Sequence, residues 1–331
     1  MSQSSTRQIG KVDAAMEKTS HSTIKEIRHS YQKSLDMIDI DILLAHATGQ
    51  SREFLLAHPD YTLADTEYTQ AIGYLERRIN HEPIAYILGK KEFYGLDFIV
   101  NQYTLIPRPE TELLIDETLK ILSVKCTEKN SPSPLIIDIG TGSGNIIITL
   151  ATLLHKKNIT ANLFGLDISP DALEIAKKNA QQHGVGNQIT FLQSDLLEKF
   201  FTSKKIQPGS PIKSGMTIQE YEYTQILILA NLPYLSQDIY QSAELDVKDY
   251  EPITALVSDE AGLTHYRRLL EQIDALCQKN IFSSRSITLI LEISPEQKPL
   301  IEALISTIFP DARIAFIQDY SQRTRFVKIE L

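Results

Sequence analysis

Two short segments of the chain carry groups that could hold small polar ligands. Residues 138–144 read Asp-Ile-Gly-Thr-Gly-Ser-Gly. Because glycine has no Cβ, backbone N–H groups in such a turn can approach a ligand closely, and the N-terminus of the following helix favours electronegative groups. Residues 231–234 read Asn-Leu-Pro-Tyr. They combine a side-chain amide oxygen, a backbone carbonyl, a rigid proline and an aromatic face, which are the groups needed to hold a planar NH2 group flat.

Each segment also has simpler interpretations. The glycine-rich turn could be a structural tight turn or a nicotinamide site as well as a site for a nucleotide-like methyl donor. The second segment could be a strand-ending turn stiffened by proline. If the turn does hold a cofactor, five of its residues are the candidates for contacting it: Gly140, Thr141, Gly142, Ser143 and Gly144.

Short, continuous apolar runs alternate with helical segments from about residue 134 onward. Strands are predicted over residues 135–139, 161–168, 189–193, 226–230 and 287–293. Near-continuous apolar strands are typical of a parallel sheet that is buried on both faces, with helices on either side. Two more predicted strands, residues 312–318 and 325–330, are close enough in sequence to form a closing hairpin. The sequence therefore predicts an α/β fold with a mostly parallel, seven-stranded sheet.

Polar residues occur where four of these strands end: Asp138, Asp167, Asp195 and Asn231. Ligands of open α/β sheets lie outside the carboxyl ends of the strands, near the point where the strand order reverses, so we expect these side chains to share one crevice. Asp167 follows the glycine turn at about the 20-residue separation typical of ribose-binding acids. Asp195 could accept from an exocyclic amine, and Asp138 could orient the glycine loop. Each aspartate taken alone is more often a helix cap or a solvated loop residue, and it is their joint placement that favours a shared site.

Other chemistries lack their motifs. The sequence contains no GxxxxGK[ST] phosphate loop, no GxSxG elbow and no HExxH pair, and its eight histidines have no metal-ligand spacing. We therefore predict no metal site and interpret His81, His183 and His265 as surface or capping residues. Arg108 and Glu112 lie in a segment stiffened by two prolines. They could line the mouth of the cofactor site or pair with each other.

Charge and cysteine content restrict the partners and the compartment. The net charge of −9 and pI near 5.4 disfavour a nucleic-acid substrate, whose binding relies on Lys and Arg, and favour a protein partner. Cys126 and Cys277 are far apart, which excludes a disulfide scaffold and suggests a reducing cytoplasm. No signal peptide is evident and no apolar run approaches the roughly 20 residues of a membrane span. We expect a cytoplasmic protein without membrane contact.

The expected organisation has four parts. Residues 1–22 have the composition of a disordered tail, residues 23–85 show the periodicity of a small helical domain, and residues 86–106 favour a β-hairpin linker. Residues 107–331 form the α/β domain, which carries an irregular insertion at about 201–223.

The chain resembles the HemK/PrmC family of S-adenosylmethionine-dependent enzymes from about residue 35 to the C-terminus. The motifs that carry the resemblance are residues 82–89 (Glu-Pro-Ile-Ala-Tyr-Ile-Leu-Gly), 92–95 (Glu-Phe-Tyr-Gly), 105–112 (Leu-Ile-Pro-Arg-Pro-Glu-Thr-Glu), 138–144, 231–234, 250–252 (Tyr-Glu-Pro) and 291–293 (Leu-Glu-Ile). The family pattern at the second of the four residues 231–234 is proline, where this chain has Leu232. The insertion is longer than is usual for the family, and Ser294 stands where the family has glycine.

The resemblance implies a class I methyltransferase fold and a specific reaction. These enzymes methylate the glutamine side chain of the Gly-Gly-Gln motif in class 1 peptide-chain release factors and so modulate translation termination. In the family interpretation, Asn231 Oδ1 and the carbonyl of Leu232 accept the two amide protons, Pro233 stiffens the turn, and Tyr234 stacks on the amide plane. Asn231 is also expected to contact the donor, and the helical domain to recognise the release factor.

Several alternatives to this function stay open. A ribosomal-protein glutamine methyltransferase is the nearest alternative, and a nucleobase amino N-methyltransferase could use the same Asn-Leu-Pro-Tyr segment. A binding module that holds the donor without catalysis is a third. The sequence indicates no acceptor for the amide proton.

Overall fold

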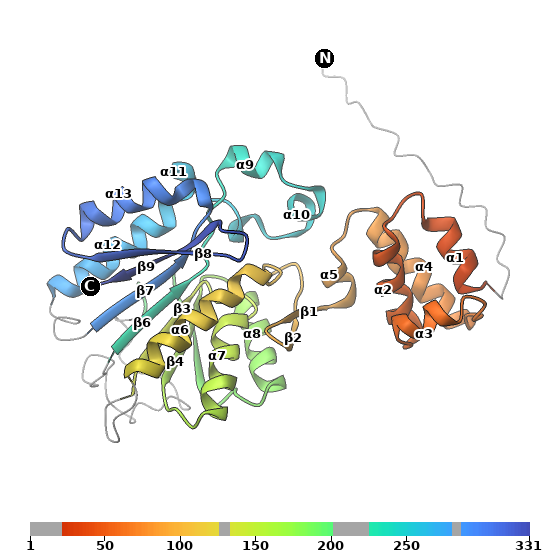
Figure 1. Ribbon diagram of the computed structural model, residues 1–331, viewed down its shortest axis with the longest axis horizontal. Helices are drawn as coiled ribbons and strands as arrows, with labels where there is room; N and C mark the ends of the chain where they lie inside the picture. Colours follow the sequence, from red (N-terminus) through yellow and green to blue (C-terminus); the bar gives the residue numbers. More distant parts are fainter. Residues whose placement is uncertain (1–21, 126–132, 201–224, 280–285) are drawn as a thin grey trace, which may run out of the picture. The chain divides into compact units, whose positions relative to one another are not determined.

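The computed structural model describes residues 22–125, 133–200, 225–279 and 286–331, and the chain divides into two compact units, residues 1–88 and 89–331 (Figure 1). The predicted insertion and the predicted tail, except Ser22, lie outside the described residues, as does Cys126. Ser22 is buried, and its carbonyl accepts a hydrogen bond from Leu63 N–H at 3.1 Å.

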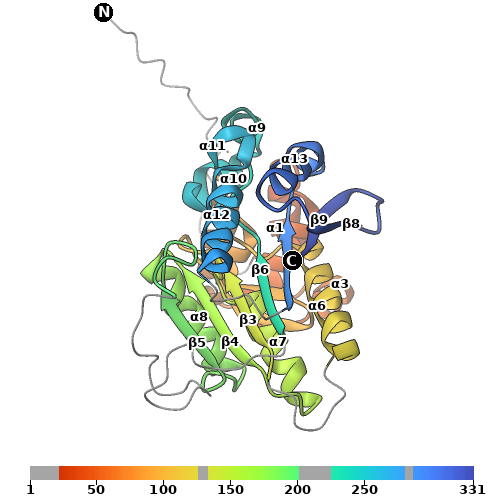
Figure 2. The same ribbon diagram turned by 90° about the vertical axis from the view of Figure 1, so that its left-hand side faces the viewer.

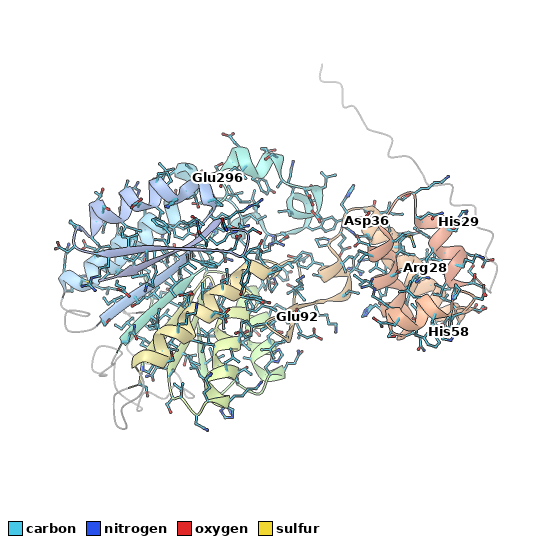
Figure 3. All side chains as sticks on the ribbon, viewed as in Figure 1. Arg28, His29, Asp36, His58, Glu92 and Glu296 are labelled. Atoms are coloured by element: carbon cyan, nitrogen blue, oxygen red, sulfur yellow. The ribbon has the colours of Figure 1, made fainter. Side chains whose placement is uncertain are left out.

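The described part of the smaller unit contains five helices: α1 (Ile24–Tyr31), α2 (Met37–Thr48), α3 (Arg52–Ala57), α4 (Asp65–Ile79) and α5 (Ile84–Leu88). Apolar positions at helical spacing form its core, including the fully buried Leu44 and Leu75. Thr23 caps α1 in a capping box with Glu26. Arg28 of α1, labelled in Figure 3, donates to Asp41 of α2 at 2.7 Å.

The larger unit contains a seven-stranded sheet with the order β5-β4-β3-β6-β7-β9-β8. Its strands are β3 (Leu135–Ile139), β4 (Asn162–Asp167), β5 (Ile189–Gln193), β6 (Gln225–Ala230), β7 (Ser286–Glu292), β8 (Arg313–Gln318) and β9 (Thr324–Glu330). The first five pair in parallel, and β9 runs antiparallel to both β7 and β8. The predicted α/β fold, its parallel strands and its closing hairpin are confirmed.

Helices cover both faces of the sheet (Figures 1 and 2). One face packs against α6 (Glu112–Lys125), α7 (Asn145–Lys156) and α8 (Pro170–Gln182), and the other against α12 (Thr264–Gln278) and α13 (Lys298–Ile308). Successive β3 side chains alternate between these layers, since Ile136 joins the α6–α8 core and Ile137 joins the α12–α13 core. This two-sided burial is why the strands are apolar throughout.

A two-stranded hairpin, β1 (Lys90–Phe93) and β2 (Leu96–Ile99), belongs to the larger unit. Phe93 and Phe98 are buried in the core layer of α6–α8. Asn179 of α8 binds β2 through both ends of its amide, because its Oδ1 accepts from Ile99 N–H at 2.7 Å and its Nδ2 donates to the Ile99 carbonyl at 3.0 Å. The segment predicted as a linker therefore divides, with its first residues in α5 and its hairpin fixed to the α/β unit.

Short helical segments complete the described chain: η1 (Pro109–Thr111), α9 (Gln237–Ser242), α10 (Leu245–Tyr250), η3 (Ile253–Ala255), α11 (Asp259–Gly262) and η4 (Pro295–Gln297). Four of these six lie between β6 and α12. None of the helices in the described part of the chain combines the length and apolar character that crossing a membrane requires.

Candidate active site

A cavity of about 260 Å³ opens at the carboxyl ends of β3, β4 and β6, where the strand order reverses. Several residues proposed from the sequence line it: Arg108, Gly140, Thr141, Gly142, Ser143, Asp167, Asp195, Asn231, Leu232 and Pro233. The glycine turn and the Asn231 segment therefore face one space, although about 90 residues of sequence separate them.

The glycine turn is fastened to the sheet by side-chain and backbone hydrogen bonds. Asp138 is fully buried, and its Oδ2 accepts from the Thr141 hydroxyl at 2.6 Å. Burial raises the pKa of Asp138 to about 7, and the Thr141 hydrogen bond partly offsets that rise. The N–H groups of Gly140 and Thr141 donate to the Leu166 carbonyl of β4 at 2.8 and 2.9 Å. Asp138 thus orients the loop.

Gly144 has a structural role distinct from that of the other glycines. It forms the N-cap of α7 with a φ of +81°, a left-handed conformation that disfavours other residues. A Cβ there would lie 2.6 Å from Ile148 Cδ1 and 3.2 Å from Ala176 Cβ. Gly144 is therefore required by the backbone and by packing between α7 and α8, whereas Gly140 and Gly142 line the cavity.

Asp167 ends β4 and joins the glycine turn to Ser169, the N-cap of α8. Its Oδ2 accepts from Gly142 N–H at 2.8 Å and its Oδ1 accepts from Ser169 N–H at 2.9 Å. Burial raises the pKa of the Asp167 carboxyl, and these backbone donors counteract the rise. Each carboxylate oxygen can accept a second hydrogen bond, so ligand hydroxyl groups can bind to Asp167 without displacing the loop.

Asp195 is paired with a residue that the sequence analysis did not identify. Arg268 of α12 contacts it through Nη2 and Oδ2 at 2.7 Å, and both side chains line the cavity. His265 also lines the cavity, although the sequence interpretation placed it on the surface or at a cap. Burial, followed by the charge of Arg268, lowers the pKa of His265. The period of an amphipathic helix does not show which of its polar residues faces a cavity.

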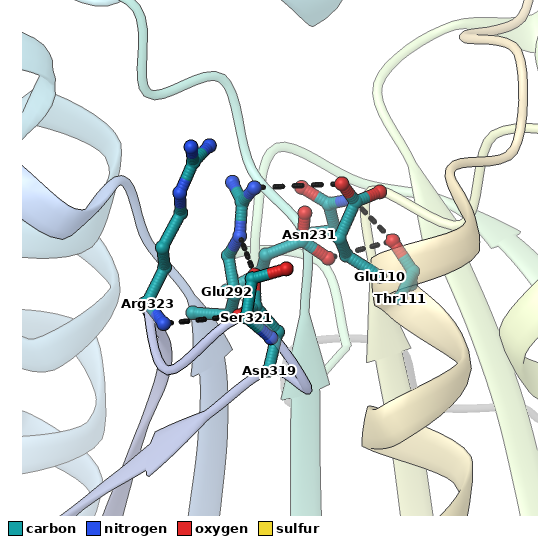
Figure 4. A network of polar contacts seen from close by, with 8 residues as sticks. Glu110, Thr111, Asn231, Glu292, Asp319, Ser321 and Arg323 are labelled. Carbon is teal, nitrogen blue, oxygen red and sulfur yellow. Dashed lines mark hydrogen bonds and ion pairs between the residues drawn. The ribbon is translucent and has the colours of Figure 1, made fainter.

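Asn231 begins a buried chain of hydrogen bonds (Figure 4). Its Nδ2 donates to Thr111 Oγ1 at 3.3 Å, and the Thr111 hydroxyl donates to Glu292 Oε2 at 2.7 Å. Thr111 is 1% exposed and Glu292 is 2% exposed, so water cannot substitute for these partners. These hydrogen bonds join the end of β6, η1 and β7. Because Asn231 Nδ2 is bound to Thr111, Asn231 Oδ1 lies on the opposite side of the amide.

Leu232 and Tyr234 differ in their surroundings. The Leu232 side chain is buried, and its carbonyl accepts from the Tyr266 hydroxyl at 3.3 Å, while the same hydroxyl makes a shorter contact with the Glu292 carbonyl. Tyr234 is partly buried against the core that contains Leu232, and the Tyr234 residue is absent from the cavity lining. Burial, followed by the charge of Glu292, raises the Tyr234 pKa, so the phenol stays neutral.

Arg108 and Glu112 do not pair with each other. Arg108 Nη2 lies 2.6 Å from Glu251 Oε1, and the buried Glu251 also accepts from Ile106 N–H at 3.3 Å. Glu112 Oε1 instead accepts from Tyr94 N–H at 2.8 Å. Arg108 lines the cavity, whereas Glu112 holds the turn of the β1–β2 hairpin. Of the two alternatives from the sequence, the mutual pair is therefore wrong, and a place at the cavity holds for Arg108.

The chain is similar to known proteins over most of its length. Residues 30–89 match the PrmC N-terminal domain and residues 131–207 match a methyltransferase domain. The release factor glutamine methyltransferase of Bacillus anthracis is 30% identical over 292 residues, which cover 88% of this chain and 91% of that protein. That of Haemophilus influenzae is 34% identical over 247 residues, 73% of this chain and 76% of that protein.

The chain belongs to the release factor glutamine methyltransferase family. The resemblance to HemK/PrmC proteins is thereby confirmed, as is the class I methyltransferase fold. A bifunctional methyltransferase of Rickettsia bellii is also 33% identical over 317 residues, which cover 89% of this chain. The match covers 51% of that relative, so the chain spans about half of its length.

The methyltransferase has acidic and amide groups at its cavity, and in the described residues no group of three or more His, Cys, Asp or Glu side chains is arranged to hold a metal ion. Asp167, Asp195 and the glycine turn lie at the ends of β3 to β5, and Asn231 lies at the end of β6. The cavity can therefore accept hydroxyl and amine groups on one side and orient a planar amide on the other.

The buried Glu292 of the methyltransferase predicts a pH-dependent stability. Burial raises its pKa to about 7 from a usual value of 4.5, so the folded state holds this proton more tightly than the unfolded chain. Stability from this group is complete below pH 4.5 and is lost as pH rises through about 7, by on the order of 3 kcal/mol. Glu292→Gln cannot ionise. We expect its free energy of unfolding to fall less than that of the wild type between about pH 5 and about pH 8 in urea titrations.

The exposed Glu296, labelled in Figure 3, provides the matched control for this measurement. Glu296→Gln removes one carboxyl from η4, which follows β7, without changing a buried group. Its free energy of unfolding should follow the wild-type pH dependence. An identical pH dependence for wild type and Glu292→Gln would contradict the burial argument.

Proposed function

We propose that the cavity binds S-adenosylmethionine and that the chain transfers its methyl group to the side-chain amide nitrogen of the glutamine in the Gly-Gly-Gln motif of class 1 release factors. The observation that carries this proposal is the shared cavity of the glycine turn and Asn231. The names of the relatives support the substrate class, since two of those cited are release factor glutamine methyltransferases. Modulation of translation termination is the expected consequence.

The donor end of the proposed site is the glycine turn with Asp167 and Asp195. The missing Cβ atoms of such a turn suit close approach by a nucleoside, and the Asp167 carboxylate suits its ribose hydroxyls. Asp195, held by Arg268, has a second carboxylate oxygen that suits an exocyclic amine. The bound donor would supply an electrophilic methyl group on a sulfonium centre.

The acceptor end is the Asn231 segment. An amide nitrogen is a poor nucleophile because its lone pair is delocalised into the carbonyl, so catalysis depends on placement. In this proposal, Asn231 Oδ1 and the Leu232 carbonyl accept the two N–H bonds of the glutamine amide and direct its nitrogen at the methyl carbon. Pro233 restricts the turn. Tyr234 packs against the core that contains Leu232, and in this proposal its ring stacks on the substrate amide plane.

The reaction forms an N–C bond at the glutamine and breaks the methyl carbon–sulfur bond of the donor, which leaves a thioether. The positive charge passes to the amide nitrogen, which then releases one proton. Orientation in a site of this kind contributes about 7–11 kcal/mol to lowering a barrier. That contribution is large enough for transfer without a dedicated base.

Removal of the Asp167 carboxylate tests the donor end. We expect Asp167→Ala to raise the dissociation constant for S-adenosylmethionine roughly 10- to 100-fold, because hydrogen bonds to a charged group contribute about 1.5–3 kcal/mol. Titration calorimetry measures the change. Asp171→Asn is the matched control, since Asp171 is exposed at the start of α8 and outside the cavity lining. Equal donor affinity in Asp167→Ala and Asp171→Asn would exclude ribose recognition by Asp167.

The proposed substrate is tested with labelled methyl donor and a purified class 1 release factor. Label should appear in the release factor and disappear when the glutamine of its Gly-Gly-Gln motif is replaced. Label that persists in that variant, or appears only on nucleic acid or a ribosomal protein, would contradict the proposal. A cytoplasmic location and recognition of the release factor by the helical unit, residues 1–88, belong to the same proposal.

A further inference from the structure

Thr111 and Glu292 fall within two sequence motifs for which the proposed reaction has no use, yet they contact its central residue. Thr111 comes from the Arg-Pro-Glu-Thr-Glu segment and Glu292 from the Leu-Glu-Ile segment. They are separated by 181 residues and meet beneath Asn231 (Figure 4). Thr111 reaches the cavity lining, while Glu292 lies behind it.

The number of protons in this chain decides which way the Asn231 amide points. A threonine hydroxyl has one proton, and an ionised carboxylate can only accept. Because the Thr111 proton is directed to Glu292 Oε2 at 2.7 Å, Thr111 Oγ1 can only accept from its other neighbour. Asn231 must therefore present Nδ2 to Thr111, as it does at 3.3 Å, and its Oδ1 takes the opposite side.

We propose that Thr111 and Glu292 are positioning residues that fix the orientation of the Asn231 amide, so that Oδ1 accepts from the substrate glutamine. The inference rests on the proposed function. The reversed orientation would place an NH2 group of Asn231 against the NH2 group of the substrate, with two donors and no acceptor. The chain of bonds excludes that arrangement before the substrate arrives.

In this proposal, the charge state of Glu292 controls the orientation of the Asn231 amide. A protonated Glu292 can donate to Thr111, which frees the Thr111 proton for Asn231 Oδ1 and permits the reversed amide. Burial raises the Glu292 pKa to about 7, and its hydrogen bond from Thr111 and the charge of Arg325 counteract the rise. The charged, titratable or hydroxyl groups that act on Glu292 or contact its backbone come from four elements and their flanks (η1, β6, α12 and β9): Arg108, Glu110, Thr111, Tyr234, Tyr266 and Arg325.

The first test replaces the hydroxyl with a methyl group of nearly the same shape. We expect Thr111→Val to lower kcat for release-factor methylation roughly 100-fold, the cost of misplacing a reacting group, with little change in donor affinity. Thr111→Ser restores the hydroxyl and should recover most of the lost kcat. Thr118→Val is the matched control, because Thr118 is as buried as Thr111 but its hydroxyl donates to the Leu114 carbonyl of its own helix. It should keep the wild-type kcat.

The second test uses the pH profile, which a purely structural role would not alter. Wild-type kcat should rise with pH through the Glu292 pKa, as the carboxylate form accumulates. Glu292→Gln permits both orientations of the Asn231 amide at every pH. Its kcat should therefore be lower than that of the wild type and should not show this rise with pH (the pH limb). Thr111→Val should lack it too, because the link to Asn231 is broken, while Thr118→Val should retain it.

The outcomes separate this inference from the proposed function. If wild type does not methylate the release factor, the proposed function itself fails. If wild type is active and Thr111→Val keeps its kcat, or Thr111→Val and Glu292→Gln keep the wild-type pH limb, the positioning role is wrong. Thermal unfolding and donor titration on each variant show that the protein is folded. If Thr111→Val does not fold, the pH profile of Glu292→Gln still tests the positioning role.

Discussion

Asn231→Ala is expected to lower kcat for glutamine methylation by roughly 10³-fold, since the variant loses the proposed acceptor for the substrate amide. The side chain lies in the cavity, and its only recorded protein hydrogen bond among the described residues goes to Thr111 through Nδ2. Removing it should therefore leave the fold intact. Single-turnover transfer of labelled methyl groups to a release factor measures the rate of the chemical step.

The methylation rate of Asn231→Gln and the donor affinity of both variants show how Asn231 acts. Asn231→Gln keeps the amide but adds one methylene, which moves the oxygen out of place. It should therefore be as impaired as Asn231→Ala. Donor affinity should change little in either variant if Asn231 acts mainly on the acceptor. A near-normal methylation rate in Asn231→Ala would remove the basis of the proposed mechanism.

Gly262→Ala is expected to cause the largest loss of stability, about 3–5 kcal/mol, through combined backbone strain and overpacking. Gly262 ends α11 with a φ of +86°, and a Cβ there would lie 2.0 Å from the Tyr234 carbonyl oxygen and 2.4 Å from Gln297 Nε2. The Tyr234 carbonyl is backbone, so it cannot move without the segment that carries Asn231. We expect lower kcat as well as a lower free energy of unfolding in urea.

Gly184→Ala separates strain from crowding. Gly184 also has a positive φ, +70°, but a Cβ there would meet no atom within 4 Å. The alanine at 184 should cost only the left-handed strain, about 1–2 kcal/mol, and leave kcat unchanged. Similar losses of stability in the two variants, with full activity in Gly262→Ala, would show that the contact with Tyr234 does not position the 231–234 segment.

The strands and the closing hairpin were predictable because burial leaves a direct pattern in sequence. Residues 135–139 are apolar apart from Asp138, and β3 occupies the same five residues with both faces covered. The turn of the β1–β2 hairpin was also recognisable from Gly95 and its aromatic neighbours. Its attachment was not predictable, because the deciding contacts come from Asn179, about 80 residues further along the chain.

The candidate site was predictable only in part. The glycine turn, Asp167 and Asn231 have local signatures, since they follow apolar strands at the edge where ligands bind in such sheets. Arg268 lies on an amphipathic helix, where its sequence context resembles that of a solvated residue, yet it pairs with Asp195 across 73 residues. The local context of Arg108 and Glu112 left two alternatives, a place at the mouth of the site or a mutual pair. Arg108 lines the cavity, and each residue has its polar partner elsewhere.

The amino-acid sequence alone predicts the α/β class, the edge of the sheet at which the candidate site lies, and the family, because apolar runs, glycine spacing and short motifs are local properties of the chain. The partners that surround the candidate site residues are visible only in the folded chain. The hydrogen bonds of Asn231 and Thr111 join β6, η1 and β7, and the steric need for Gly262 arises from a carbonyl outside its own helix. Such contacts depend on how distant segments pack, so they cannot be predicted from residues that are neighbours in the sequence.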